Sequence, residues 1–241
     1  LCDYHYFSPN AVTIPFQLHK TNTDAQQTTF LSDENQANLS EKAQKYLSDL
    51  GIIDFDSNRE HAALIWLHAL AIGYASDYVK ENGDGLRSDY PRIPLPKDKD
   101  LLFASARLGR RVADLLDMGK KVDGVTSGQI DNMLSQIAVP SASDDKTELS
   151  GWGKPNRNGV GTAVAKLVKR EDSYDVYFNK TDQAHWRNVP LKVWQYRVGG
   201  YPVLPKWLSY RDVRFLGRPL KNPDETREFM HIARRIEALI A

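Results

Sequence analysis

Cysteine is nearly absent from the chain, since Cys2 is the single one among 241 residues. This excludes a disulfide within the chain and favours a reducing, cytoplasmic setting. Long apolar runs are lacking too: the best stretch, residues 62–75, is interrupted by His68 and is shorter than the roughly 18 residues of a membrane helix. The N-terminus has no initiator Met and no signal region. We expect a globular chain with no membrane contact, in which Leu1 marks a cut inside a longer polypeptide.

Signatures of catalysis are missing as well. No Walker-type phosphate loop occurs, and Gly159-Val160-Gly161 precedes a strand pattern rather than a helix, which argues against a dinucleotide site. The six histidines lack the spacing of metal ligands, and only His5 lies near the single cysteine, Cys2. The Pro-Pro-aromatic motif with which amino-methyltransferases hold a flipped base is absent. The sequence therefore predicts no catalytic residue, no metal site and no cofactor in this chain.

What the chain does have is a separation of charge. Residues 1–150 carry 15 Lys+Arg against 22 Asp+Glu, a net charge of −7, whereas residues 151–214 carry 12 against 5, a net charge of +7. A basic segment of this length beside an acidic body indicates a surface for a polyanion, most often a nucleic acid. A solvated, lysine-rich sheet face is the alternative that charge alone leaves open.

The hydrophobic spacing predicts an α+β fold: a mainly helical body with a small basic antiparallel β lobe and a C-terminal helix. Helices are expected from a Ser40 cap to Gly51, then over about 58–81, 100–116 and 122–138, and from an Asn222 cap to the end. A hairpin is expected over residues 162–178.

Three further predictions concern the end of the second helix, an extended run after it and the apolar faces of the helices. Asn82-Gly83-Asp84-Gly85 is predicted to end the second helix, and the run Asp89–Pro96 to be extended because of its three prolines. The predicted apolar stripes are Leu64, Leu67, Ala71, Tyr74 and Tyr78 on the second helix, Leu101, Ala104, Leu108, Val112 and Leu115 on the third, and Phe229, Ile232, Ile236 and Leu239 on the last.

The predicted organisation has five parts. They are a connector from an upstream module (1–30), the helical body (31–139), a polar hinge (140–150), the basic recognition lobe (151–214) and a closing helix (215–241).

Two segments of the basic lobe carry residues suited to DNA contact. In residues 151–159 glycines flank Lys154, Asn156, Arg157 and Asn158, and in residues 192–211 aromatic, amide and guanidinium side chains surround a Gly pair. The candidates for phosphate contact are Lys154, Arg157, Lys166, Lys169, Arg170, Arg197, Lys206 and Arg211. The candidates for base or close backbone contact are Asn156, Asn158, Gln195 and Tyr201. A turn-rich linker with incidental charges is the alternative for the first segment, and Trp194, Trp207 and Leu208 are expected to fill the core.

Residues 194–211 closely resemble the signature W-x-Y-x-[IV]-G-G-Y-x-V-L-x-K-W-L-x-x-R of the C-terminal specificity region of type ISP restriction-modification enzymes and related large adenine methyltransferases. Residues 89–96 resemble the family's D-[FY]-P-R-I-P-[FL]-P run, and Tyr74–Tyr78 its Y-x-x-L-x-S-x-x-Y helix with departures before Ser76. The resemblance extends over about residues 60–240. We expect the proline run to pack as a strut, with a DNA contact by Arg92 as the alternative.

The resemblance implies a recognition domain that follows an adenine-N6 methyltransferase module, in a parent protein with or without nuclease activity. It implies double-stranded DNA and that upstream module as partners, with S-adenosylmethionine as the cofactor of the parent and not of this chain. Two other classes stay open: a protein-interaction scaffold or subunit-docking domain of a defence complex, and an enzyme that binds S-adenosylmethionine in its own right.

Overall fold

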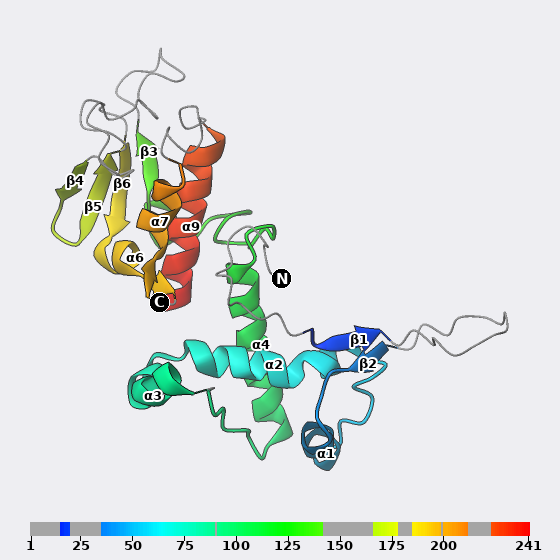
Figure 1. Cartoon of the computed structure of the whole chain (residues 1–241). Coiled ribbons are helices and arrows are strands. Elements are labelled where there is room, and N and C mark those ends of the chain that lie inside the picture. The colour runs from blue at the N-terminus through cyan, green and yellow to red at the C-terminus, as the bar shows by residue number, and fades with distance from the viewer. Residues whose placement is uncertain are drawn as a thin grey trace, which may run out of the picture. The chain divides into compact units, whose positions relative to one another are not determined.

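The computed structural model describes residues 15–19, 35–89, 91–141, 166–177, 185–198, 200–211 and 223–241. Two compact units make up the chain, Leu1–Asp117 and Met118–Ala241. Helices occur together with small antiparallel sheets, so the expected α+β class is confirmed (Figure 1). The division lies upstream of the predicted hinge, and residues 118–139 belong to the second unit rather than to the helical body. Residues 142–150 of that hinge lie outside the described residues.

In the described residues of the first unit, four helices accompany a short two-stranded sheet. Its described elements are β1 (Gln17–His19), β2 (Asn35–Ala37), α1 (Glu41–Asp49), α2 (Arg59–Tyr74), α3 (Ser76–Ser88) and α4 (Lys99–Leu116). The predicted Ser40 cap is confirmed, since its side chain accepts from the Ala43 N–H, and Asn58 accepts at the predicted start of α2. Asn222, the predicted cap of the last helix, lies outside the described residues. Leu47, Ile52 and Leu102 are almost fully buried and form the centre of this unit's core.

The prediction of one helix over residues 58–81 is wrong, because α2 and α3 meet at an angle of 90°. Ala75 between them is extended, with φ −71° and ψ 121°. The predicted helix end at residues 82–85 is also wrong, since α3 runs through both glycines to Ser88. The Tyr78 hydroxyl on α3 donates to the Arg92 carbonyl at 3.1 Å, a tertiary contact that local periodicity does not report. Within the described residues, no single helix is long and apolar enough to cross a bilayer.

Helix α4 has the predicted length but buries a partly different face. Leu115 of the predicted stripe is buried, but Leu101 and Leu108 are 58% and 63% exposed, and Leu102, Ala106 and Gly109 are buried instead. A Cβ atom added at Gly109 would lie 1.8 Å from the Leu67 carbonyl oxygen of α2. The two helices, which cross in Figure 1, therefore approach at backbone distance, and small side chains rather than leucines occupy the crossing.

The proline run, residues 91–96, has no helix, as predicted, and its carbonyls bind three of the helices. Besides the Tyr78 bond, the Pro94 carbonyl lies 2.8 Å from His68 Nε2, and the Pro96 carbonyl accepts from the Tyr46 hydroxyl at 2.7 Å. His68 Nδ1 lies 2.7 Å from the Ser105 hydroxyl, so both ring nitrogens of this buried histidine are satisfied. The run thus acts as a strut, and the Arg92 side chain stays 92% exposed.

The second unit contains a four-stranded antiparallel sheet in the order β3-β6-β5-β4. Its described elements are α5 (Asn132–Ser135), β3 (Val139–Ser141), β4 (Lys166–Lys169), β5 (Ser173–Tyr177), β6 (His185–Pro190), α6 (Leu191–Gln195), β7 (Arg197–Val198), β8 (Tyr201–Pro202), α7 (Val203–Ser209) and α9 (Asp224–Ile240). The β4–β5 pairing confirms the predicted hairpin for these residues. The helix predicted over 122–138 shrinks to α5, since Gly124 and Gly128 have positive φ and form turns ahead of it.

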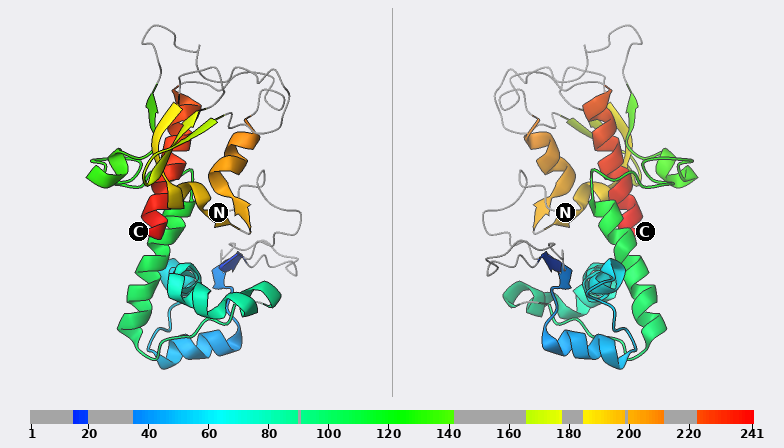
Figure 2. Two further views of the ribbon diagram at one scale, coloured as in Figure 1. Left: turned by 90° about the vertical axis from the view of Figure 1, so that its left-hand side faces the viewer. Right: turned by 90° about the vertical axis from the view of Figure 1, so that its right-hand side faces the viewer.

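Trp186 and Phe229 form the centre of the second unit's core. Trp186 of β6 is fully buried, stacks on Phe229 of α9 with the ring centroids 4.1 Å apart, and donates from Nε1 to the Thr226 carbonyl. The predicted stripe on the last helix is confirmed for Phe229, Ile232 and Ile236. Figure 2 shows α9 running beside the strands of the sheet. The sheet and α9 are the scaffold that carries α6, β7, β8 and α7.

Candidate nucleic-acid interface

Residues 194–211 fold into a tight unit in which the β7–β8 hairpin connects α6 to α7. Val193 of α6 and Leu204 and Leu208 of α7 are completely buried. Trp207 is buried as well, with its ring 5.5 Å from that of Phe229. Of the three predicted core residues, Trp207 and Leu208 are therefore buried, while Trp194 is half-buried beside Tyr174. The buried side chains of α6, before the hairpin, and of α7, after it, therefore hold the hairpin to the scaffold.

The hairpin itself is fixed by its turn. Arg197 pairs with Pro202 and Val198 with Tyr201, and Gly200 has φ +83°, which favours glycine. The Arg197 guanidinium donates to the Gly200 carbonyl at 2.6 Å, and the Val203 N–H donates to the Tyr196 carbonyl at 3.1 Å. These bonds close both ends of the hairpin, so that its side chains project from a defined backbone.

Four of the predicted contact residues project into solvent here: Gln195, Arg197, Tyr201 and Lys206. Together we call them the signature surface. Lys206 Nζ lies 4.8 Å from the ring centroid of Tyr210 and 5.7 Å from that of Tyr201, so its charge sits between two exposed aromatic rings. Cations, an amide and aromatic faces gathered on one short segment suit phosphate contact and base contact alike.

Arg211 differs from the other candidates because it is only 9% exposed. Its Nη2 donates to both carboxylate oxygens of Glu228, at 2.9 and 3.0 Å, and its guanidinium carbon lies 3.7 Å from the centroid of Trp207. An arginine buried and paired in this way holds α7 to α9 and is not presented to a phosphate. We therefore leave Arg211 out of the signature surface.

The edge of the sheet supplies two further candidates, Lys169 and Arg170. Lys169 at the end of β4 is exposed. Arg170 is 58% exposed, but its guanidinium bonds the buried Asp175 carboxylate at 2.5 and 2.7 Å. The other Asp175 oxygen accepts from the N–H of Asn188, whose φ of 56° marks the irregular register of β6. The Arg170 guanidinium thus stabilises the sheet, and only the part of it that is not bonded to Asp175 is available to a ligand.

The remaining candidates lie outside what the structure describes. They are Lys154, Asn156, Arg157 and Asn158, together with the side chain of Lys166, whose backbone opens β4. Their predicted roles stay predictions.

Sequence patterns missed several cations of the second unit. Arg187 on β6 is exposed, and Arg227 and Arg235 with His231 line a hollow along α9. With the boundary after Asp117, the second unit carries 20 Lys+Arg and 14 Asp+Glu, a net charge of +6. The helical spacing of residues 227, 231 and 235 was a usable signal, but it lay outside the segment of highest charge.

Within the described residues, no group of three or more His, Cys, Asp or Glu side chains has the arrangement of a metal site.

A family model described as the Type ISP C-terminal specificity domain matches residues 1–236, which is nearly the whole chain. The chain therefore belongs to the Type ISP C-terminal specificity domain family. Such a domain serves target recognition in a restriction-modification enzyme. No curated protein and no solved structure matches the chain.

Proposed function

We propose that this domain recognises a specific sequence in double-stranded DNA through the signature surface. The observation that supports the proposal most directly is the exposure of Gln195, Arg197, Tyr201 and Lys206 on a hairpin and its flanking helices. The buried side chains of those helices are Val193, Leu204, Trp207 and Leu208. The major groove of B-DNA admits a two-stranded β-ribbon, and an amide with two cations supplies the chemistry of base contact and phosphate contact. The net charge of +6 on the second unit favours the approach of a polyanion.

In this proposal the domain selects the site and a separate module modifies it. The parent would be an adenine-N6 DNA methyltransferase, with S-adenosylmethionine bound in the module upstream of this domain. The duplex would be held between that module and the recognition domain while the target adenine is flipped out of the stack. Lys154, Arg157, Lys166 and Lys169 remain candidates for phosphate contact next to the signature surface.

Replacement of Lys206 by glutamine should weaken binding to all duplexes about equally. One phosphate contact contributes about one unit to the slope of log K against log salt, so the slope should become shallower by about that amount. Fluorescence anisotropy with a labelled duplex over a salt series measures both effects. Lys42→Gln is the matched control, because Lys42 is an exposed lysine on α1 of the acidic first unit. Equal slopes for the K206Q variant and the unmodified domain would remove Lys206 from the interface.

Replacement of Gln195 by alanine should act on specificity rather than on total affinity. A bidentate amide contact to a base discriminates by about 1–3 kcal/mol, so one position of the target should become degenerate. Selection from a randomised duplex library, sequenced before and after binding, provides the measurement. Gln136→Ala, at an exposed glutamine elsewhere in the second unit, is the control. If the selected sequences are unchanged, Gln195 reads no base.

A protein-docking role is the second candidate, and two ion pairs favour it. Lys192 Nζ lies 2.7 Å from the Glu237 carboxylate, and Arg211 is bound to Glu228, so part of the positive charge is neutralised inside the second unit. If most cations serve such pairs, no open basic surface remains. A gel shift at low and at moderate salt separates the two functions: a docking domain leaves the duplex unshifted in both.

A further inference from the structure

Two tyrosines of the second unit expose their rings next to the same lysine. Tyr201 of β8 is 63% exposed, and Tyr210, directly after α7, is 48% exposed. Lys206 Nζ lies 5.7 Å from the ring centroid of Tyr201 and 4.8 Å from that of Tyr210. Among the aromatic side chains that the structure describes, these two are exposed and the others are buried or partly buried. The exposed rings therefore form one patch, which we call the tyrosine pair.

The hairpin fixes the position of Tyr201. Tyr201 pairs with Val198, and the turn between them contains Gly200 with a φ of +83°. The Gly200 carbonyl accepts from the Arg197 guanidinium, which closes the turn from the side. The exposed ring is thus attached to a defined backbone. Its ordering on binding costs little conformational entropy, because a tyrosine ring is positioned by two rotatable bonds.

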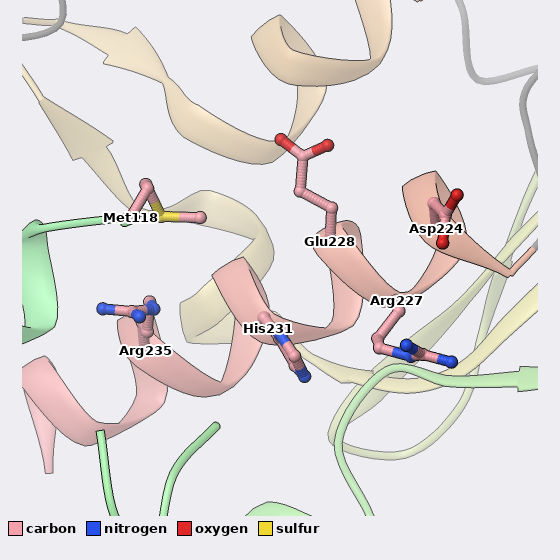
Figure 3. A pocket seen from close by; sticks show the side chains of 6 residues that line it. All are labelled: Met118, Asp224, Arg227, Glu228, His231 and Arg235. Atoms are coloured by element: carbon pink, nitrogen blue, oxygen red, sulfur yellow. The ribbon is translucent and has the colours of Figure 1, made fainter. Parts of the chain in front are cut away.

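Tyr210 lies between two anchored residues at the end of α7. Leu208 before it is completely buried, and Arg211 after it is 9% exposed. The Arg211 guanidinium donates to both carboxylate oxygens of Glu228 on α9. Figure 3 shows the Glu228 side chain directed away from the side chain of Arg227 on the same helix. The exposure of the Tyr210 ring is therefore a feature of a well-attached segment and not of a loose chain end.

The charge beside the tyrosine pair is positive. Residues 183–211 contain no aspartate or glutamate, and the carboxylates that border this stretch, Asp182 and Asp212, lie outside the described residues. The two α9 carboxylates next to α7 form ion pairs with Arg211. Lys206 forms no ion pair with a carboxylate of the described residues. Its ammonium group can therefore bind a phosphate next to the two rings.

An aromatic ring presents a flat face, and an intact duplex has no base face to place against it. Within a duplex the neighbouring base pairs cover the faces of each base, so that the grooves present base edges only. A base face becomes accessible when the base leaves the stack or loses its partner. Stacking of such a base on an aromatic side chain tolerates any sequence and strengthens binding by about fivefold or more.

We propose that the tyrosine pair is a stacking site for an unpaired DNA base, with Lys206 on a phosphate of the same strand. This inference rests on the proposed recognition of DNA and goes beyond it, since Gln195 needs a base edge and this site needs a base face. It gives a ligand contact to Tyr210, which sequence patterns did not select. A flipped adenine leaves its partner base unpaired, so base flipping produces the ligand of this site.

The test compares the binding of two DNA duplexes of equal length to the full chain. One duplex is fully paired. The other has an abasic site opposite one base, which loses its partner while every phosphate stays in place. Fluorescence anisotropy at low salt gives both dissociation constants. The proposal expects the duplex with the unpaired base to bind about fivefold more tightly or better.

Two double variants separate stacking from other causes of this preference. Tyr201→Leu with Tyr210→Leu keeps apolar side chains but removes both rings, and it should bind the two duplexes equally. Tyr201→Phe with Tyr210→Phe keeps both rings and should retain the preference. Circular dichroism checks that both variants are folded, as expected for substitutions of exposed side chains. A preference that survives in the leucine variant comes from the flexibility of the abasic duplex, and one lost in the phenylalanine variant comes from the hydroxyl groups. Either result overturns the proposal.

The remaining outcomes separate this site from the proposed function. Equal affinities of the unmodified chain for the two duplexes overturn the stacking site alone and leave the recognition of double-stranded DNA in place. Failure of both duplexes to bind at low salt overturns the two proposals together, since the stacking site rests on DNA binding.

Discussion

Trp186→Ala is expected to lose about 3–5 kcal/mol of the second unit's stability, the usual cost of removing a large buried aromatic side chain. Trp186 is fully buried, and its ring stacks on Phe229 with centroids 4.1 Å apart. Truncation also removes the donor to the Thr226 carbonyl at 3.0 Å. Because the Trp186 ring forms the contact between β6 and α9, its removal should separate the sheet from α9. Helix α9 carries Glu228, which binds Arg211 next to α7, so this anchor of α7 should be displaced from the sheet as well.

Urea unfolding followed by circular dichroism and by tryptophan fluorescence measures this loss. The control is Tyr210→Ala, which truncates an aromatic side chain of the same unit that is 48% exposed, and it should change the stability by less than about 0.5 kcal/mol. A Trp186→Ala loss as small as that of the control would show that the β6–α9 contact is not the centre of the core. DNA binding by Trp186→Ala should fall together with the folded fraction.

Gly109→Ala should destabilise the first unit although alanine is the better helix former. Substitution of glycine by alanine within a helix is worth about 1 kcal/mol in favour of alanine. At Gly109, however, the new Cβ atom would lie 1.8 Å from the Leu67 carbonyl oxygen, an atom of the α2 backbone that cannot rotate away. The helices must then move apart, and we expect a net loss of about 2–3 kcal/mol, at the upper part of the range for overpacking.

Gly83→Ala is the matched control for this variant. Gly83 lies in the middle of α3, and an added Cβ atom would meet nothing within 4 Å. It should therefore stabilise the first unit by up to about 1 kcal/mol. Thermal unfolding of the two variants should give shifts of opposite sign. A stabilising shift in Gly109→Ala, like that expected for Gly83→Ala, would mean that α2 and α4 are not in backbone contact at Gly109.

Local patterns predicted most of the elements, because their causes lie within a few residues of the chain. The Ser40 cap, the start of α2 near Asn58, the β4–β5 hairpin and the buried face of α9 depend on hydrogen bonds or spacings of short range. The proline run was predictable for the same reason, since proline restricts its own backbone and that of the residue before it. The family resemblance in residues 194–211 agrees with the family model that matches the chain.

Sequence patterns gave wrong predictions where contacts with residues distant in the sequence determine the structure. Leucine spacing on α4 predicted Leu115 correctly but Leu101 and Leu108 wrongly, because the close approach of α2 at Gly109 turns the small side chains inward. The apolar spacing continues from residue 58 to residue 81, although the backbone bends by 90° between α2 and α3. After the bend, α3 contacts the proline run through the bond from the Tyr78 hydroxyl to the Arg92 carbonyl. Arg211 looked like its neighbour Lys206 in the sequence, yet the carboxylate that binds it comes from 17 residues further along the chain.

The sequence by itself determined the α+β class, the absence of a disulfide within this chain, the positive charge of the C-terminal part and the family of this protein, since each is a property of composition or of short motifs. Only the tertiary structure decided which cations are presented to solvent. Lys206 and Arg197 remain on the surface, while Arg211 and Arg234 are buried. The reason is that a side chain's exposure depends on what packs over it, and packing partners come from anywhere in the chain.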